Sequence, residues 1–189
     1  MKIHYHQQAI ARMQLATKDM QMAEQYGGKC TWKNFPVAYQ LGVCDSLHAS
    51  LQKWFSLSSE TGGLDMTYFY TEFSIKEGQM QEQGTKLFLY QEVGPFISSD
   101  FHLEQYPQTA PVPCIYTILE SENIYPDEET ACQMVRWGKE QGAEPTGVLY
   151  SNNMTSFFRR RQQHLFPGTV YAGKIKTVKR QNKKNAGKK

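Results

Sequence analysis

The sequence of 189 residues lacks the features that mark several large classes of protein. No run of 18 or more apolar residues occurs, so no membrane-spanning helix is predicted, and the first residues contain no apolar signal core, so export is not expected. The four cysteines are scattered without a CxxC pair, which argues against a disulfide framework or a zinc site. These absences predict a cytoplasmic protein with reduced thiols and no membrane contact.

The motifs of several common chemistries are also missing. There is no GxxxxGK[ST] phosphate loop, no dinucleotide-binding GxGxxG, no zinc-binding HExxH and no GxSxG nucleophile turn. His4 and His6 would not share a helix face, and the other three histidines are isolated. We therefore expect no metal and no other cofactor, and we assign no catalytic residue.

Acidic residues are absent from the end of the chain. Residues 179–189 carry six positive charges and no acid, so the rest of the chain, with its net charge of −3, is mildly acidic. Such a composition predicts a disordered tail over residues 180–189. This tail is either a solubilising end or a weak, sequence-independent contact to nucleic acid.

The N-terminal segment has neither glycine nor proline. Residues 2–26 are rich in helix-forming side chains and are followed by Gly27 and Gly28, so the pattern predicts a helix within a first unit, residues 1–28. Ile3, Ile10 and Thr17 lie one heptad apart, and so do His6, Met13 and Met20. Two interpretations stay open: the helix pairs with a second copy in a dimer, or it packs on its own domain.

The remainder of the chain, residues 29–179, shows the order strand, helix, strand, strand twice. Trp54 and Trp137 align the two helices, and the low identity between the halves makes this a repeat of pattern. We expect Leu47, Leu51, Trp54 and Phe55 along one side of the first helix. The predicted elements are strand 35–43, helix 46–60 and strands 66–73 and 86–93 in a first repeat (about 33–96), and strand 112–121, helix 127–141 and strands 146–153 and 169–178 in a second (about 110–179). The pattern predicts an α+β fold: two repeats related by a pseudo-twofold axis, with a largely antiparallel sheet, after an N-terminal helix.

Several segments resemble a known family. Residues 114–117, Tyr125, residues 134–137, Gly142 and residues 147–150 are similar to the second half of the gyrase-inhibitor-like effector-binding domain, and residues 64–68 are similar to its middle. This domain is the C-terminal ligand sensor of many MerR-type and AraC-type transcription regulators, including multidrug sensors. The resemblance covers about residues 33–179 and implies a ligand cleft at the pseudo-twofold axis, preceded in MerR-type regulators by a dimerisation helix.

Strand alternation places aromatic and acidic side chains together. Tyr68, Tyr70 and Glu72 share one face of their strand, while Phe69 and Phe73 suit the helix-covered face. Tyrosines beside a carboxylate can hold a flat or cationic organic molecule, although solvated alternation at a sheet edge is the simpler interpretation. With the resemblance, we expect an open cleft that binds a small aromatic ligand. Its predicted lining residues are Tyr68, Tyr70, Glu72, Tyr90, Tyr116, Glu120 and Tyr150.

One departure from the family bears on the ligand. Cation-binding relatives carry a glutamate beside the tyrosine that corresponds to Tyr150, whereas the neighbours here are Leu149 and Ser151. Either another glutamate substitutes or the ligand is neutral.

The resemblance implies the effector-sensing domain of a bacterial transcription regulator, which contacts DNA only through a missing or separate DNA-binding domain or weakly through the tail. Two alternatives stay open: a small hydrolase of hydrophobic electrophiles that uses the same cleft, and a non-catalytic inhibitor or sequestering protein.

Overall fold

The computed structural model describes residues 2–60, 67–97, 100–119, 123, 125–153, 168–172 and 175–176. The predicted tail, residues 180–189, and the predicted site residue Glu120 lie outside this part of the chain. The helices and 3-10 helices are α1 (Lys2–Tyr26), α2 (Leu47–Glu60), η2 (Gln91–Phe96), η3 (Leu103–Gln105) and α3 (Glu128–Glu140). The strands are β1 (Thr31–Asn34), β2 (Ala38–Cys44), β3 (Tyr68–Lys76), β4 (Gln79–Tyr90), β5 (Pro113–Leu119), β6 (Glu144–Pro145), β7 (Val148–Asn153), β8 (Gly168–Ala172) and β9 (Ile175–Lys176).

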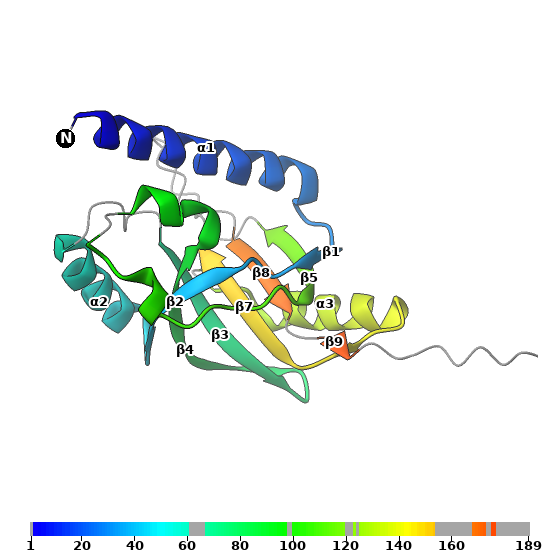
Figure 1. The fold of residues 1–189 in the computed structure, drawn as a ribbon. Coiled ribbons are helices and arrows are strands. Elements are labelled where there is room, and N and C mark those ends of the chain that lie inside the picture. Colours follow the sequence, from blue (N-terminus) through cyan, green and yellow to red (C-terminus); the bar gives the residue numbers. More distant parts are fainter. Residues whose placement is uncertain are drawn as a thin grey trace, which may run out of the picture.

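Seven strands form one sheet in the order β1-β5-β8-β7-β3-β4-β2 (Figure 1), and neighbouring strands are antiparallel. Apart from β1, each edge shows the same order: the strand before the helix is outermost, the last strand of the repeat follows, and the strand after the helix is innermost. The equivalent strands β3 and β7 pair antiparallel at the centre, as a twofold axis requires. This arrangement confirms the predicted α+β fold with two strand-helix-strand-strand repeats.

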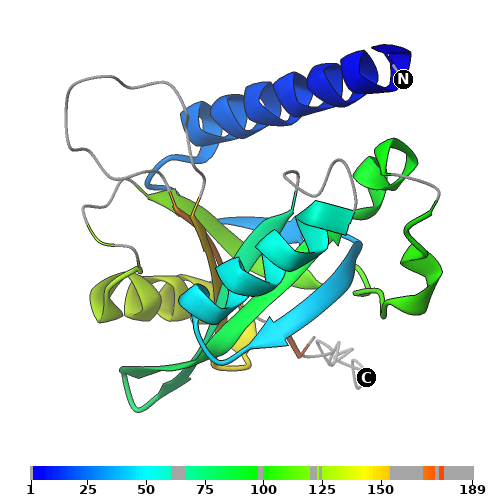
Figure 2. The same ribbon diagram turned by 90° about the vertical axis from the view of Figure 1, so that its left-hand side faces the viewer.

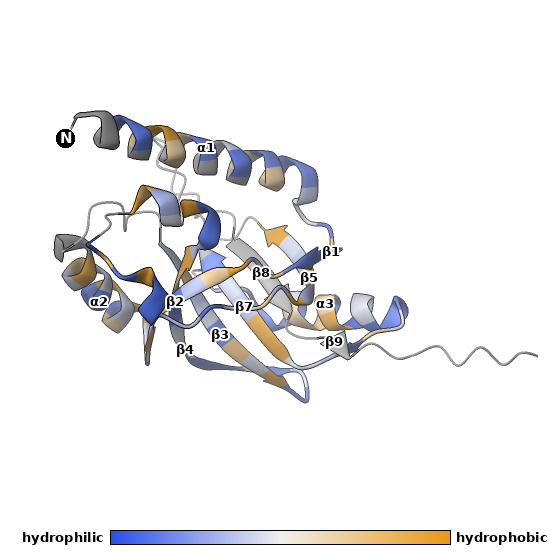
Figure 3. Ribbon diagram, in the orientation of Figure 1, coloured by the Kyte–Doolittle hydropathy of each residue, from blue (hydrophilic) through white to orange (hydrophobic). Residues whose placement is uncertain are grey.

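The sheet separates α1 from the other two helices (Figure 2). α2 and α3 pack on the face that carries Phe69 and Phe73, as the alternation predicted. α1 crosses the opposite face, where its C-terminal half contributes Met22, Ala23 and Tyr26 to the packing. In Figure 3, apolar segments occur in strands β3, β5 and β7 and in helices α2 and α3, whereas α1 is largely hydrophilic with isolated apolar turns. The core therefore forms on both faces of the sheet, and α1 closes one of them.

Helix α3 follows from local sequence signals. The Asp127 side chain accepts a hydrogen bond from the Thr130 N–H at 2.8 Å, and this cap lowers the pKa of Asp127. Ala131, Met134 and Gly138 are buried and, being three or four residues apart, share one face of the helix. Gly142 follows the helix with a φ of +78°, a conformation that glycine adopts at low cost. The helix predicted over residues 127–141 is confirmed as α3, and its caps are Asp127 and Gln141.

Helix α2 lies where it was predicted but is rotated about its axis. Trp54 and Leu57 pack toward β2, β3 and β4, whereas Leu51 and Phe55 are 38% and 64% exposed. Ser50 is fully buried, and its hydroxyl donates a hydrogen bond to the Ser46 carbonyl. The expectation that Leu51 and Phe55 share the buried side with Trp54 is therefore wrong.

The first strand of repeat one also differs from the prediction. β2 begins at Ala38 rather than at Phe35, and the unexpected β1 pairs with β5 of the second repeat. Residues 35–37 connect these two strands and leave the Phe35 side chain buried above the sheet. β1 extends the sheet because β5 would otherwise be an unpaired edge.

Candidate functional site

The face of the sheet under α1 carries the predicted aromatic residues. Tyr68, Tyr70 and Glu72 point to this face from β3, and Glu72 lies opposite Tyr150 at the junction with β7. In the β3–β4 pair, Tyr68 lies opposite Phe88 and Tyr70 lies opposite Lys86. The centre of the molecule, where the two repeats meet, is therefore lined by side chains of both.

Two tyrosine pairs order the wall of repeat one. The rings of Tyr68 and Tyr90 stack with centroids 4.2 Å apart and an interplanar angle of 14°. The hydroxyl groups of Tyr70 and Tyr90 lie 2.5 Å apart and share a hydrogen bond. Burial, together with the neighbouring Tyr90, raises the pKa of Tyr70 well above its usual value, so this hydroxyl stays protonated.

Phe35 fills the space between the two walls. Its ring centroid lies 5.4 Å from those of Tyr70 and Tyr150 and 5.7 Å from that of Phe88. Tyr70 is fully buried as a result. The expectation of an open aromatic wall is therefore wrong for this conformation, because Phe35 packs against the rings that a ligand would contact.

A second group of residues closes the cluster from the side of α1. The rings of Tyr26 and Tyr116 meet edge to face at 5.7 Å, and Tyr116 is also fully buried. The Lys33 ammonium lies 4.5 Å from the Tyr116 ring centroid and 3.1 Å from the sulfur of Met22. The end of α1 and the start of β1 thus contact the aromatic cluster directly.

Glu72 has a partner within the protein. Its carboxylate forms an ion pair with Lys86, whose ammonium also lies 3.3 Å from the Tyr150 hydroxyl and 5.2 Å from the Tyr150 ring centroid. Burial raises the pKa of Glu72, but the hydrogen bonds from Lys86 and Tyr150 and the charge of Lys86 outweigh it and lower that pKa. Burial and the carboxylate of Glu72 raise the pKa of Tyr150. The glutamate is therefore ionised and neutralised at neutral pH.

Six of the seven predicted site residues meet in this one cluster, and Glu120 is the exception because it is not described. Sequence reasoning missed Phe35, Lys33 and Lys86. The lysine at position 86 had a signal, because it lies four residues before Tyr90 in a strand and so shares its face. Glu92, two residues after Tyr90, lies in η2 and forms an ion pair with Lys18.

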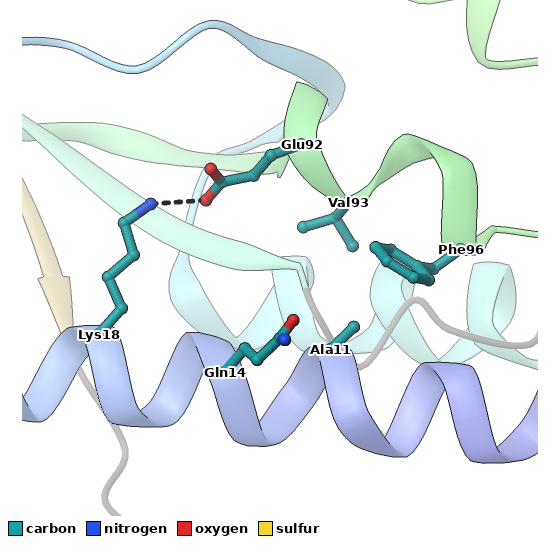
Figure 4. Close-up of a pocket in the computed structure, with 6 residues that line it drawn as sticks. All are labelled: Ala11, Gln14, Lys18, Glu92, Val93 and Phe96. Atoms are coloured by element: carbon teal, nitrogen blue, oxygen red, sulfur yellow. Dashed lines mark hydrogen bonds and ion pairs between the residues drawn. The ribbon is translucent and has the colours of Figure 1, made fainter.

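A separate pocket of about 190 Å³ lies between α1 and η2 (Figure 4). The Lys18 ammonium and the Glu92 carboxylate are 2.8 Å apart at its rim, but both side chains are about half exposed, so the pair is weak. Figure 4 shows Gln14, Val93 and Phe96 facing one another across the space. The pocket marks an incompletely packed contact between α1 and the domain.

The described residues contain no group of three or more histidine, cysteine, aspartate or glutamate side chains that could hold a metal ion. Cys114 is buried, and burial raises the pKa of its thiol to about 11, so it is protonated at neutral pH. Within the same part of the chain, no helix is long and apolar enough to cross a bilayer.

Comparison with known proteins shows a similar fold among solved structures. No protein-family model and no curated protein sequence matches the chain. Among solved structures, the chain is similar to a chain of the cryo-EM structure of an EcmrR–DNA complex in EcmrR-RPo, with a TM-score of 0.53 and 9% identity over 94% of this chain and 67% of that chain. The crystal structure of the EcmrR C-terminal domain gives a TM-score of 0.48 and 8% identity over 79% of this chain and 98% of that chain. At these identities the similarity concerns the fold alone.

Proposed function

We propose that this chain is the effector-binding domain of a transcription regulator and binds a small flat aromatic molecule between its two repeats. The observation that carries the proposal is the convergence of Tyr68, Tyr70, Tyr90, Tyr116 and Tyr150 at the junction of β3 and β7. Rigid aromatic side chains supply apolar contact at low entropic cost. The fold similarity to EcmrR, a MerR-family regulator, supports the regulatory context.

Ligand entry requires the cluster to open. Phe35 occupies the space between Tyr70 and Tyr150, and it belongs to the connection between β1 and β2 rather than to a strand. An aromatic ligand would replace the contacts of this ring with contacts of its own. The closed conformation is then the ligand-free state, and the cost of moving Phe35 lowers the apparent affinity.

The same cluster reaches α1. Tyr26 packs on Tyr116, and Lys33 lies over both rings at 5.8 Å and 4.5 Å from their centroids. A ligand that displaces either side chain would change how the end of α1 sits on the sheet. The difference between the ligand's affinities for the two positions of α1 would supply the free energy of switching.

We further propose that α1 pairs with α1 of a second copy, which would carry this change to DNA through a separate DNA-binding domain. Ile10, Met13 and Met20 are 55%, 69% and 69% exposed, so part of the predicted heptad seam faces away from the domain. Ala11, on the adjacent side of the helix, is buried against the domain. α1 therefore has one face for its own domain and a second apolar face for a partner.

Ligand binding is tested with 1-methylnaphthalene, an uncharged two-ring probe, by isothermal titration calorimetry. The variant Tyr68→Ala removes a stacked ring and should weaken binding by about three- to tenfold, which corresponds to about 0.7–1.4 kcal/mol. Phe55→Ala is the matched control, because Phe55 is an exposed aromatic residue on the other side of the sheet. Equal loss in both variants, or no binding to the wild type, would contradict the proposed site. The hydrolase alternative is tested separately by incubating the protein with an aromatic ester. Release of the free acid and alcohol would favour that alternative.

Dimerisation is tested by sedimentation velocity. We expect the wild-type chain to sediment as a dimer and Met13→Glu/Met20→Glu as a monomer, because two buried carboxylates without partners are costly. The control Gln7→Glu/Gln21→Glu adds the same charge at exposed polar positions of α1 and should remain a dimer. A monomeric wild-type chain would rule out pairing through α1.

A further inference from the structure

The aromatic cluster already contains cations of the protein's own. Lys86 lies opposite Tyr70 in the β3–β4 pair, so its side chain emerges on the cleft face beside Glu72. The side chains of Lys86 and Glu72 are only 24% and 22% exposed, and their charged groups are in contact. A partly buried carboxylate would otherwise attract an organic cation, and here Lys86 takes that place.

The Lys86 ammonium also occupies the position beside an aromatic ring that a cationic ligand would use. It lies 5.2 Å from the Tyr150 ring centroid, within the range of a cation–π contact. Lys33 of β1 lies 4.5 Å from the ring centroid of Tyr116. Each of the two rings thus has a lysine ammonium of the protein beside it.

The charge balance follows from these contacts. Among the described side chains of the cleft, Lys33 and Lys86 each carry a positive charge and Glu72 carries the negative one. A hydrophobic cation would have to break the pair between Glu72 and Lys86 and would then lie beside a like charge. An uncharged aromatic molecule needs only to displace Phe35.

We propose that Lys86 is a specificity-determining residue that excludes organic cations, so that the ligand of this cleft is an uncharged aromatic molecule. The proposal rests on the proposed function and narrows its ligand class. The sequence left two alternatives open, a substitute glutamate or a neutral ligand. The proposal favours the neutral ligand, because the Glu72 carboxylate pairs with Lys86.

The test uses two probes of the same shape, 1-methylquinolinium and 1-methylnaphthalene, which differ in a single ring atom and one positive charge. Their affinities for the full chain are measured by isothermal titration calorimetry. We expect the wild type to bind the uncharged probe more tightly than the cation by about tenfold or more, which corresponds to about 1.4 kcal/mol. Lys86→Met keeps an unbranched side chain that is one heavy atom shorter, removes its charge and should reverse the preference.

Three further variants make the test specific. Lys86→Arg keeps the charge and should keep the wild-type preference. Glu72→Gln/Lys86→Met removes both charges and should lose the gain in cation binding, since no carboxylate remains to attract the cation. Circular dichroism checks that each variant is folded, and the double variant remains informative if Lys86→Met alone does not fold, because it leaves no unpaired buried charge.

The outcomes separate the two claims. Binding of both probes with equal affinity by the wild type, or an unchanged ratio in Lys86→Met, would overturn the role of Lys86 and leave the aromatic site intact. Absence of binding by either probe to every variant would overturn both the role of Lys86 and the proposed site.

Discussion

Replacement of Phe35 by alanine provides the sharpest test of the closed cleft. Phe35 is 7% exposed and packs against three aromatic rings, and loss of a buried phenyl ring costs about 3–5 kcal/mol. The surrounding backbone can relax little, because the Phe35 N–H donates to the Val112 carbonyl at 2.8 Å and the Thr109 hydroxyl bonds to the Pro36 carbonyl at 2.8 Å. A cavity should therefore remain, and we expect a loss of about 4 kcal/mol.

Urea unfolding followed by tryptophan fluorescence measures this loss. With a denaturant slope of about 2 kcal/mol per molar urea, the midpoint should fall by about 2 M. The cavity is continuous with the tyrosine walls, so Phe35→Ala should also bind 1-methylnaphthalene about tenfold more tightly than the wild type, since the cost of displacing the ring is gone. Phe35→Leu should give smaller changes of the same sign in both measurements.

Phe73→Ala is the matched control. Phe73 is 4% exposed and lies on the opposite face of the sheet, where it packs on Tyr125 with centroids 5.1 Å apart. This variant should lose similar stability but gain no affinity, because the void left by one phenyl ring is too small for a two-ring probe. Similar affinity gains in both variants, or none in Phe35→Ala, would refute the reasoning that Phe35 blocks a ligand site.

Two further predictions concern α3 and Glu72. A Cβ at Gly138 would collide with the Ile115 side chain, so Gly138→Ala should lower the free energy of unfolding by about 1–3 kcal/mol despite the better helix propensity of alanine. The control Gln133→Ala, at an exposed position of the same helix, should not lower it. Urea unfolding of both variants measures the difference. The pKa of Glu72 is lowered by Lys86 in the folded state, so the pair stabilises the protein above the ordinary glutamate pKa of 4.5 and this contribution is lost as pH falls through the lower, folded-state value. Urea midpoints measured from pH 6 to pH 2 should fall less steeply for Glu72→Gln than for the wild type, and parallel curves would contradict the sign of this shift.

Elements with local signals were predictable from the sequence. α1 matches the predicted residues 2–26, and α3, with its cap at Asp127, lies within the predicted helix 127–141. Helix caps and helical periodicity depend on residues within a few positions of one another, so they can be recognised without knowledge of the fold.

Elements that depend on distant partners were not predictable. β1 exists because it pairs with β5, some eighty residues further along the chain. The two-residue strand β6 likewise depends on a distant partner, β9. The rotation of α2 buries Ser50 and leaves Phe55 exposed, although the spacing of Phe55 fits a buried face, because the packing of the helix on the sheet decides which side is covered.

The candidate site shows the same division. Alternation alone put Tyr68, Tyr70 and Glu72 on one face, because successive side chains of a strand point to opposite sides whatever the strand pairs with. The sheet register decided that Lys86 lies beside Glu72, and the β1–β2 connection decided that Phe35 fills the space between the repeats. The sequence by itself determined which side chains of a strand share a face, since that is a property of one strand. Only the tertiary structure decided that Phe35 fills the space between the repeats and that Lys86 neutralises Glu72, since both depend on contacts between segments far apart in the chain.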